Sequence, residues 1–167
     1  MSNTNGIHTI SILVANKPGV LVRCAQIFAR RAFNIDALVV SPAVNPKYSR
    51  MTITLQGDIG TFDQIIKQTN KLVDVIHCSE HTGLDAVTKE YALLKLKCPT
   101  EAVKTAIKKA IKSKAHIVDQ SVKGVLIIGQ SGSTEELDDL EKVLKKFKII
   151  EMVRSGKLAM AKGLEAT

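Results

Sequence analysis

Hydrophobic and polar positions in the first half of the chain switch repeatedly between the period of a strand and that of a helix. Strand-like alternation or β-rich composition marks residues 8–14, 35–41, 50–55 and 75–79, and helical spacing marks 20–34 and 62–73. Asn34 is expected to end the first helix. Thr61 and Gln64 have the spacing of a capping box, which is typical of a helix start. The predicted order is βαββαβ.

The same order repeats after a glycine-containing stretch, residues 81–85, which resembles a linker. Strands are predicted over 92–98, 117–122, 125–130 and 149–154, with a tight hairpin at Lys123-Gly124. One helix is expected after a Thr100 cap, and another after the capping box formed by Ser133 and Glu136.

The predicted fold class is α+β, with two ferredoxin-like βαββαβ sandwiches in tandem, over residues 1–83 and 84–167. Each sandwich places two helices on one face of an antiparallel sheet and leaves the other face bare. A small domain of this kind tends to bury that face, or to pair its edge strands, against another copy. We therefore expect a homodimer or a higher oligomer.

Charge distinguishes the two halves. The chain has a net charge of +8; residues 1–87 contribute +2 and residues 88–167 contribute +6. Lys104, Lys108 and Lys112 form a stripe at helical spacing, for which a solvated surface is the leading interpretation and docking of an acidic protein the alternative. Aromatic residues make up 4% of the chain and no helix-turn-helix pattern is present, so nucleic-acid binding is not expected.

Cysteine usage and hydropathy indicate a cytoplasmic protein. Cys24, Cys78 and Cys98 are widely spaced and odd in number, so they form no complete disulfide framework, which favours a reducing compartment. The first residues lack the features of a signal peptide, and no apolar run reaches the roughly 18 residues of a membrane span.

Signatures of catalysis are scarce, and we predict neither catalytic residues nor a metal site. His77, Cys78 and His81 resemble a ligand set, but on a strand the two histidines would lie about 13 Å apart. The segment 129–133 could bind an anion at a helix start, although a turn capped by Ser133 is the favoured interpretation.

The turn Asn16-Lys17-Pro18-Gly19 is the strongest candidate for a binding site. It leads from a strand into a helix, whose first N–H groups, at Gly19, Val20 and Leu21, carry the positive end of the helix dipole. Pro18 suits the first helical turn, and Gly19 lets a ligand approach the backbone. Such a turn suits a small carboxylate, such as an amino acid whose apolar side chain lies beside Ile12 and Leu21. A plain turn with Asn16 as the helix cap is the alternative.

The residues around this turn resemble the small regulatory subunits of acetolactate synthase (acetohydroxyacid synthase), whose first domain is an ACT domain. The resemblance spans nearly the whole chain. The matching segments are Asn16-x-x-Gly19-x-Leu21-x-Arg23, Phe33-Asn34-Ile35, Ser49–Ile53, Lys71–Val75, Lys89–Lys95 and Arg154-Ser155-Gly156 to Gly163.

The resemblance implies a regulatory subunit without turnover of its own. It implies feedback inhibition by valine or another branched-chain amino acid, activation of a large catalytic subunit, and a role in branched-chain amino-acid biosynthesis. Thiamine diphosphate, magnesium and FAD would be on the catalytic subunit, with no cofactor on this chain. The effector would lie between two ACT domains, and the residues implied to bind it are Asn16, Gly19, Val20 and Leu21 of one chain, with Asn34 and Ile35 of the other.

Two departures from the family pattern fall in the second half. Lys114, Ala115 and His116 stand where the family usually has a Phe and a Gly, and Lys162-Gly163 stands where it often ends in Arg-Gly. The alternative to this assignment is a free-standing amino-acid-binding regulator that contacts nucleic acid through its basic second half.

Overall fold

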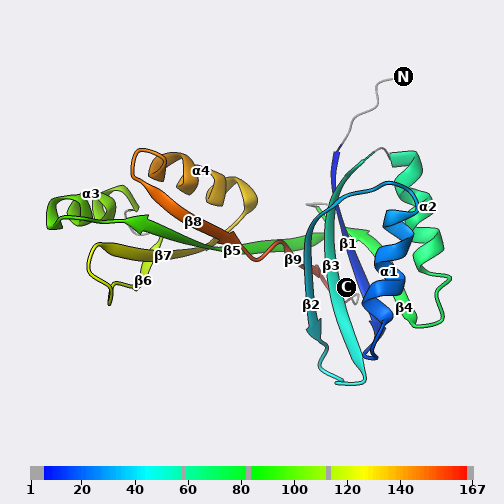
Figure 1. The fold of residues 1–167 in the computed structure, drawn as a ribbon. Helices are drawn as coiled ribbons and strands as arrows, with labels where there is room; N and C mark the ends of the chain where they lie inside the picture. Colours follow the sequence, from blue (N-terminus) through cyan, green and yellow to red (C-terminus); the bar gives the residue numbers. More distant parts are fainter. Residues whose placement is uncertain (1–5, 58, 82–83, 112–113, 165–167) are drawn as a thin grey trace. The chain divides into compact units, whose positions relative to one another are not determined.

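The computed structural model describes residues 6–57, 59–81, 84–111 and 114–164. Its contacts divide the chain into two compact units. The first combines Met1–Thr88 with Gly156–Thr167, and the second is Lys89–Ser155. Figure 1 shows the helices and strands of each unit.

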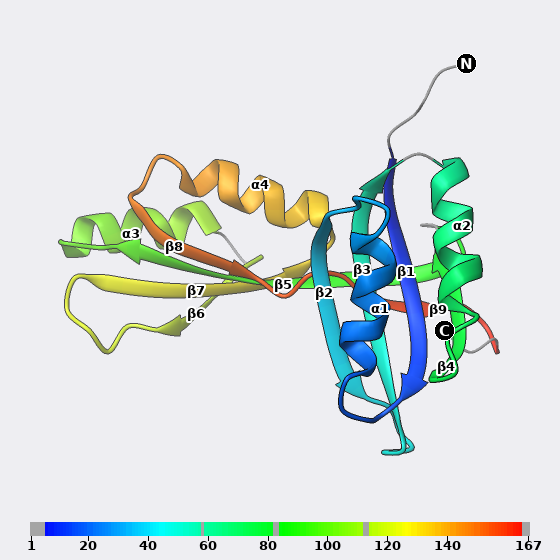
Figure 2. The same cartoon turned by 45° about the vertical axis from the view of Figure 1, so that its right-hand side comes forward.

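The first unit contains a βαββαβ fold, as predicted. Its elements are β1 (Gly6–Ala15), α1 (Val20–Ala29), β2 (Ile35–Pro42), β3 (Tyr48–Gly57), α2 (Ile59–Thr69) and β4 (Val75–His81). The antiparallel sheet has the order β2-β3-β1-β4, which leaves β2 and β4 at its edges. Figure 2 shows α1 and α2 side by side on one face, with α1 toward β2 and α2 toward β4.

Alternation along the central strands builds the core of this unit. Ile10 and Ile12 of β1 face the helices together with Ile53 of β3, and each is at most 1% exposed. Phe28 of α1 and Phe62 of α2 are buried against this row. The alternation predicted for β1 and β3 is therefore confirmed.

The other face of this sheet is not bare, which corrects our expectation for the first domain. Thr9, Ser11 and Thr54 point away from the helices, yet they are only 5%, 1% and 7% exposed. The start of β5 (Ala86–Lys97) and β9 (Leu158–Ala161), which pair with each other, run along this face (Figures 1 and 2). A Cβ on Gly156 would lie 2.9 Å from Ala37 Cβ on β2, so the segment before β9 packs directly against the sheet.

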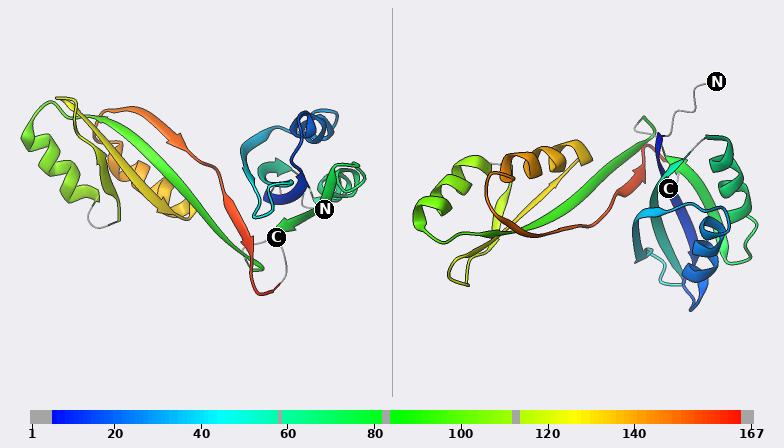
Figure 3. Two further views of the ribbon diagram at one scale, coloured as in Figure 1. Left: turned by 90° about the horizontal axis from the view of Figure 1, so that it is seen from below. Right: turned by 45° about the horizontal axis from the view of Figure 1, so that its top comes forward.

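The second unit repeats the order. After β5 its elements are α3 (Glu101–Ile111), β6 (His116–Asp119), β7 (Val125–Gly132), α4 (Thr134–Leu144) and β8 (Ile149–Arg154), and its sheet has the order β6-β7-β5-β8. Both helices cover one face (Figure 3). Thr100 Oγ1 accepts from Val103 N at 3.3 Å, and Ser133 forms a capping box with Glu136, so both predicted caps are confirmed.

Several element ends differ from the prediction. Helix α1 ends at Ala29, before Asn34, because Phe33 N bonds back to Phe28 O and Ala32 takes a positive φ of 56°. Helix α2 already starts at Ile59, so Thr61 lies inside it and is not its cap.

The predicted linker and hairpin also differ. Strand β4 extends to His81, the first residue of the stretch assigned to a linker, and β5 begins at Ala86, directly after that stretch and not at residue 92. Strand β6 ends at Asp119, so five residues rather than a tight turn connect it to β7, with Gly124 at φ +83°. The short strand β9 was not predicted, because four alternating residues carry little periodic signal.

A buried ion network joins the strands and helix of the second unit. Glu90 of β5 is 5% exposed and accepts two hydrogen bonds from Arg154 of β8, from Nη2 at 2.7 Å and Nε at 3.1 Å. Arg154 Nη1 also donates to Asp138 of α4 at 2.6 Å, and the Thr134 hydroxyl donates to Glu90. The network therefore fixes α4 against the β5–β8 pair.

The cysteines Cys24 and Cys78 are buried in the first unit's core, and we expect them to be inert in the folded protein. Burial raises the pKa of both thiols, and for Cys78 the neighbouring Cys24 raises it further, to about 12. Because only the thiolate reacts, iodoacetamide at pH 8 should modify these two residues no faster than the protein unfolds. Mass spectrometry of the native and the urea-unfolded chain measures this, and rapid native labelling of either residue would contradict it.

Because the thiol pKa values are raised in the folded protein, the stability of the fold depends on pH. The unfolded thiols ionise near their ordinary pKa of about 9, whereas the folded Cys78 stays neutral to about 12. Stability attributable to this thiol is therefore complete below pH 9 and is lost as the pH rises from 9 toward 12.

Candidate functional site

The turn between β1 and α1 is shaped by a glycine in the left-handed region. Gly19 is the N-cap residue of α1, with φ 83° and ψ −9°, and no side chain caps the helix. Residues with a Cβ rarely adopt this conformation, so the turn requires glycine here. The backbone at the start of α1 is consequently exposed.

Asn16 does not cap the helix, contrary to the simpler interpretation of the turn. Its Nδ2 donates to Pro46 O at 3.0 Å, and its backbone N donates to Lys47 O at 2.8 Å. Asn16 therefore ties the turn to the loop between β2 and β3. Pro18 also lies outside the helix, one residue before the N-cap, so its predicted place in the first helical turn is wrong.

The start of α1 presents positive charge. Within the described residues, no group accepts from the N–H of Gly19 or Leu21, and the Val20 N–H reaches Lys17 O only at 3.4 Å. These groups carry the positive end of the helix dipole. A carboxylate could accept hydrogen bonds from them.

Arg23 adds a full charge to this position, which sequence reasoning missed. A Cβ built on Gly19 would lie 3.1 Å from Arg23 Nη1, so the guanidinium extends back over the helix start. Its Nη2 donates to Asp74 at 2.6 Å, which holds the side chain in place. Two features of the sequence could have indicated this role of Arg23. It lies one helical turn after Gly19, and its partner Asp74 belongs to the matching segment Lys71–Val75.

Two apolar residues assigned to the pocket belong to the core instead. Ile12 is 0% exposed and Val20 is 2% exposed, so neither side chain can line a surface pocket. Val20 can contribute only its backbone N–H. Leu21 is 40% exposed and remains the apolar side chain of this turn that a ligand could contact.

Asn34 and Ile35 lie beyond the opposite end of α1 from Gly19. The ten-residue helix separates the two groups by about 15 Å along its axis, so one chain does not bring them together. Asn34 is exposed and its Nδ2 donates to Asp36 at 3.1 Å, whereas Ile35 packs partly against the core.

The other candidate segments have structural roles in the described part of the chain. No group of three or more His, Cys, Asp or Glu residues there is arranged to hold a metal ion. Helix α3 buries Ile107 and Ile111 and exposes Lys108, while Lys112 lies outside the described residues. None of the described helices combines the length and apolar character that a membrane span requires.

Comparison with known proteins gives the same family over both halves of the chain. Residues 10–77 match the model of the AHAS small subunit-like ACT domain, and residues 89–163 match that of the small subunit of acetolactate synthase. A probable acetolactate synthase small subunit from Archaeoglobus fulgidus is 38% identical, over 93% of this chain and 97% of its own. The acetolactate synthase small subunit of Mycolicibacterium smegmatis is 37% identical, over 98% and 95%.

The fold agrees with a solved structure of similar length. The crystal structure of an acetolactate synthase small subunit from Thermotoga maritima has a TM-score of 0.84 and 33% identity, and covers 95% of this chain and 98% of its own. The chain belongs to the family of acetolactate synthase small subunits, and its first domain is the ACT domain of that family.

Proposed function

We propose that this chain regulates an acetolactate synthase by binding valine, or another branched-chain amino acid, at its ACT domain. The start of α1 carries this proposal. There the free N–H groups of Gly19 and Leu21 and the guanidinium of Arg23 converge where the effector's carboxylate would bind. The exposed Leu21 would contact the effector's aliphatic side chain.

The second half of the pocket comes from another copy of the chain. Leu21 and Val22 of α1, with Leu38 and Val40 of the edge strand β2, are 36–58% exposed, which supports a dimer formed along this edge. In such a dimer Asn34 and Ile35 of one copy approach the Gly19 turn of the other. The Asn34 Oδ1 atom would accept a hydrogen bond from the effector's ammonium group.

Regulation requires the effector to bind one state of the complex more tightly than another. We propose that the effector stabilises a dimer arrangement that couples poorly to the catalytic subunit, with a coupling free energy of about 1–3 kcal/mol. Without effector, association raises the catalytic subunit's activity. Thiamine diphosphate, magnesium and FAD are held by that subunit, and this chain supplies no catalytic group.

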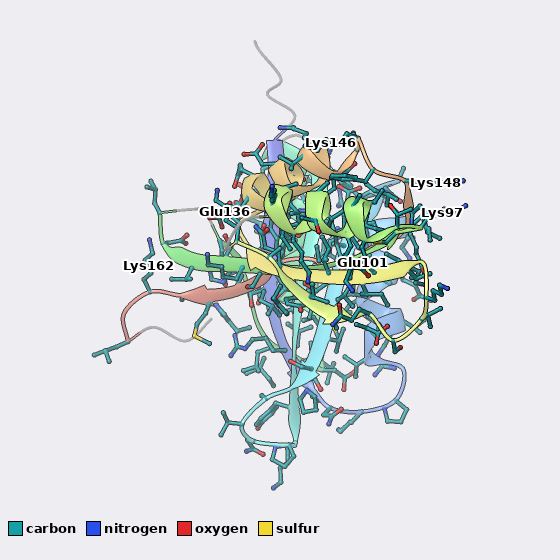
Figure 4. All side chains as sticks on the ribbon, turned by 90° about the vertical axis from the view of Figure 1, so that its left-hand side faces the viewer. Lys97, Glu101, Glu136, Lys146, Lys148 and Lys162 are labelled. Carbon is teal, nitrogen blue, oxygen red and sulfur yellow. The ribbon has the colours of Figure 1, made fainter. Side chains whose placement is uncertain are left out.

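The two domains have different roles in this proposal. Residues 1–83 bind the effector and form the dimer, and residues 84–167 assemble with the catalytic subunit. The open sheet face of the second unit supports this assignment, because Leu93, Ile127 and Val153 lie on it and Val153 is 55% exposed. Lys97 and Lys148 lie side by side in this unit, where they could meet acidic groups (Figure 4).

Reconstitution with the catalytic subunit tests the proposal. Acetolactate formation should rise when this chain is added to the catalytic subunit, and valine, leucine or isoleucine should then lower it. By reciprocity, the effector should bind the active complex more weakly than it binds this chain alone. Activation without inhibition by any of the three amino acids would refute the effector site but not the family.

Val153→Asp should weaken assembly with the catalytic subunit, because it places a charge on the proposed contact face, at its edge strand β8. Titrating the catalytic subunit with the variant should require a higher concentration for half-maximal activation. Val122→Asp is the control, since Val122 is 59% exposed in the same unit but lies in the β6–β7 connection. Equal titration curves for both variants would assign assembly to another surface.

A further inference from the structure

A cavity of about 140 Å³ lies within the second unit, between its helices and the end of β7. Its apolar wall comes from the C-terminal part of α3 and from α4, through Ala110, Ile111, Leu140 and Val143. The cavity is separate from the Gly19 turn, because all its lining residues belong to the second unit.

Gln130 is an unusual residue for its position in this cavity. It continues the row of Leu126 and Ile128 on the side of β7 that faces the helices, and it is 3% exposed. Its Nε2 donates weakly to Glu136 O at 3.5 Å, but its Oε1 has no donor among the described residues. A buried acceptor without a donor is unfavourable, and an aliphatic side chain of similar size would avoid this.

Charged groups complete the lining. Glu136 and Asp139 of α4 are among its lining residues, and so is Lys114, which follows α3. Glu136 Oε2 accepts from Ser133 N at 2.8 Å and lies 3.8 Å from Lys89 Nζ, and Asp139 Oδ1 accepts from Lys142 Nζ at 3.1 Å. The two carboxylates therefore already have partners, unlike Gln130 Oε1. Figure 4 labels Glu136 on the side of the view opposite Lys97 and Lys148.

These groups define the chemistry of a ligand. A buried amide oxygen that lacks a donor favours a donor such as an ammonium group, and the acidic residues Glu136 and Asp139 in the lining favour a cation over an anion there. The aliphatic wall favours a short hydrocarbon chain, and Lys114 favours a carboxylate at the other end. A dry cavity of about 150 Å³ accommodates benzene, so this one suits a molecule of roughly six to eight non-hydrogen atoms.

We propose that this cavity is a second small-molecule site, which binds a short aliphatic ammonium compound such as a free amino acid, with its ammonium group on Gln130 Oε1. The proposal is independent of the ACT-domain effector site, because it rests on different residues in the other unit. An amino acid and a simple alkylamine share the required ammonium group, and the test below separates them.

The test uses the full ¹⁵N-labelled chain and follows the Gln130 side-chain amide by NMR. The probes are L-valine, isobutylamine and isobutyrate, which have the same hydrocarbon branch but differ in their charged ends. Valine or isobutylamine should shift the Gln130 amide signals saturably, and isobutyrate should not. Tighter binding of valine than of isobutylamine indicates an amino acid and a role for Lys114, whereas similar binding of both indicates an amine.

Gln130→Met tests the contact with little change in volume. It should weaken binding of the responding probe by about 10-fold or more, because it removes an acceptor for a charged donor. Its thermal stability should equal or exceed that of the unaltered chain, since the variant also removes an unsatisfied buried group. The Gln130 side-chain amide is absent from this variant, so the NMR signals of Val143 report binding instead. Ser131→Ala, on the exposed side of β7, is the control and should bind the probe like the unaltered chain.

Two results would overturn the proposal. One is the absence of any saturable shift of the Gln130 amide with valine and isobutylamine in the unaltered chain. The other is unchanged binding in the Gln130→Met variant. Shifts confined to residues 16–35 would support only the ACT-domain site and would also count against this cavity.

Discussion

Replacing Gly19 by aspartate should leave the acetolactate synthase complex active and make it resistant to valine. The new side chain would start 3.1 Å from Arg23 Nη1 and would place a carboxylate where we propose that the effector's carboxylate binds. Loss of hydrogen bonds to a charged group costs about 1.5–3 kcal/mol, so the valine concentration for half-inhibition should rise roughly 10-fold to 100-fold. Acetolactate formation across a valine titration measures this.

A matched control separates the ligand effect from backbone strain. Gly124 has the same φ of +83°, and a Cβ there would meet nothing within 4 Å. Gly124→Asp therefore imposes a similar local cost without altering the α1 turn, and its complex should retain full valine sensitivity. Ordinary sensitivity in the Gly19→Asp complex would place the effector site elsewhere.

Replacing Arg154 by methionine should strongly destabilise the second unit. Glu90 would remain buried without its cation, and breaking a buried ion pair in this way costs about 3–5 kcal/mol. The Arg154 side chain is 24% exposed, so water partly screens the pair. The loss in free energy of unfolding should therefore lie toward the lower end of that range. Urea unfolding followed by circular dichroism measures the free energy of unfolding.

Lys95→Met is the control for this change. Lys95 pairs with Glu151 at 2.5 Å between the same strands, β5 and β8, but on the solvent-exposed sheet face. Exposed pairs contribute little, so this variant should unfold at nearly the same urea concentration as the unaltered chain. An equal loss in free energy of unfolding in both variants would show that the burial of Glu90 does not determine the destabilisation.

Periodicity was sufficient to predict the repeated βαββαβ order. Residues such as Ile10, Ile12 and Ile53 alternate with polar neighbours because one sheet face packs against helices. The Thr100 and Ser133 caps were also predictable, since capping depends on neighbouring residues in the chain. The Gly19 turn was found for the same reason, although its left-handed φ and the partner of Asn16 were not.

Contacts between distant segments could not be predicted in this way. Arg23 meets Asp74 across 51 residues, and no local pattern distinguishes that pair from other exposed charges. The burial of Ser11 and Thr54 depends on a segment near the chain's end that returns to the first sheet. Polar residues on that strand face favoured solvent exposure, and tertiary packing overrode the pattern.

If two copies of the chain build each effector pocket, as proposed, variants of the two halves should complement each other. Gly19→Asp and Asn34→Ala chains, carrying different affinity tags, should each form complexes that resist valine. In a symmetric heterodimer of the two variants, one pocket has both altered residues and the other has neither.

Acetolactate formation by the isolated heterodimer with the catalytic subunit, measured across a valine titration, therefore distinguishes a shared pocket from one built by a single chain. We predict that valine sensitivity, absent from both parent complexes, returns in the heterodimer. A heterodimer that remains as resistant as its parents would contradict a shared pocket.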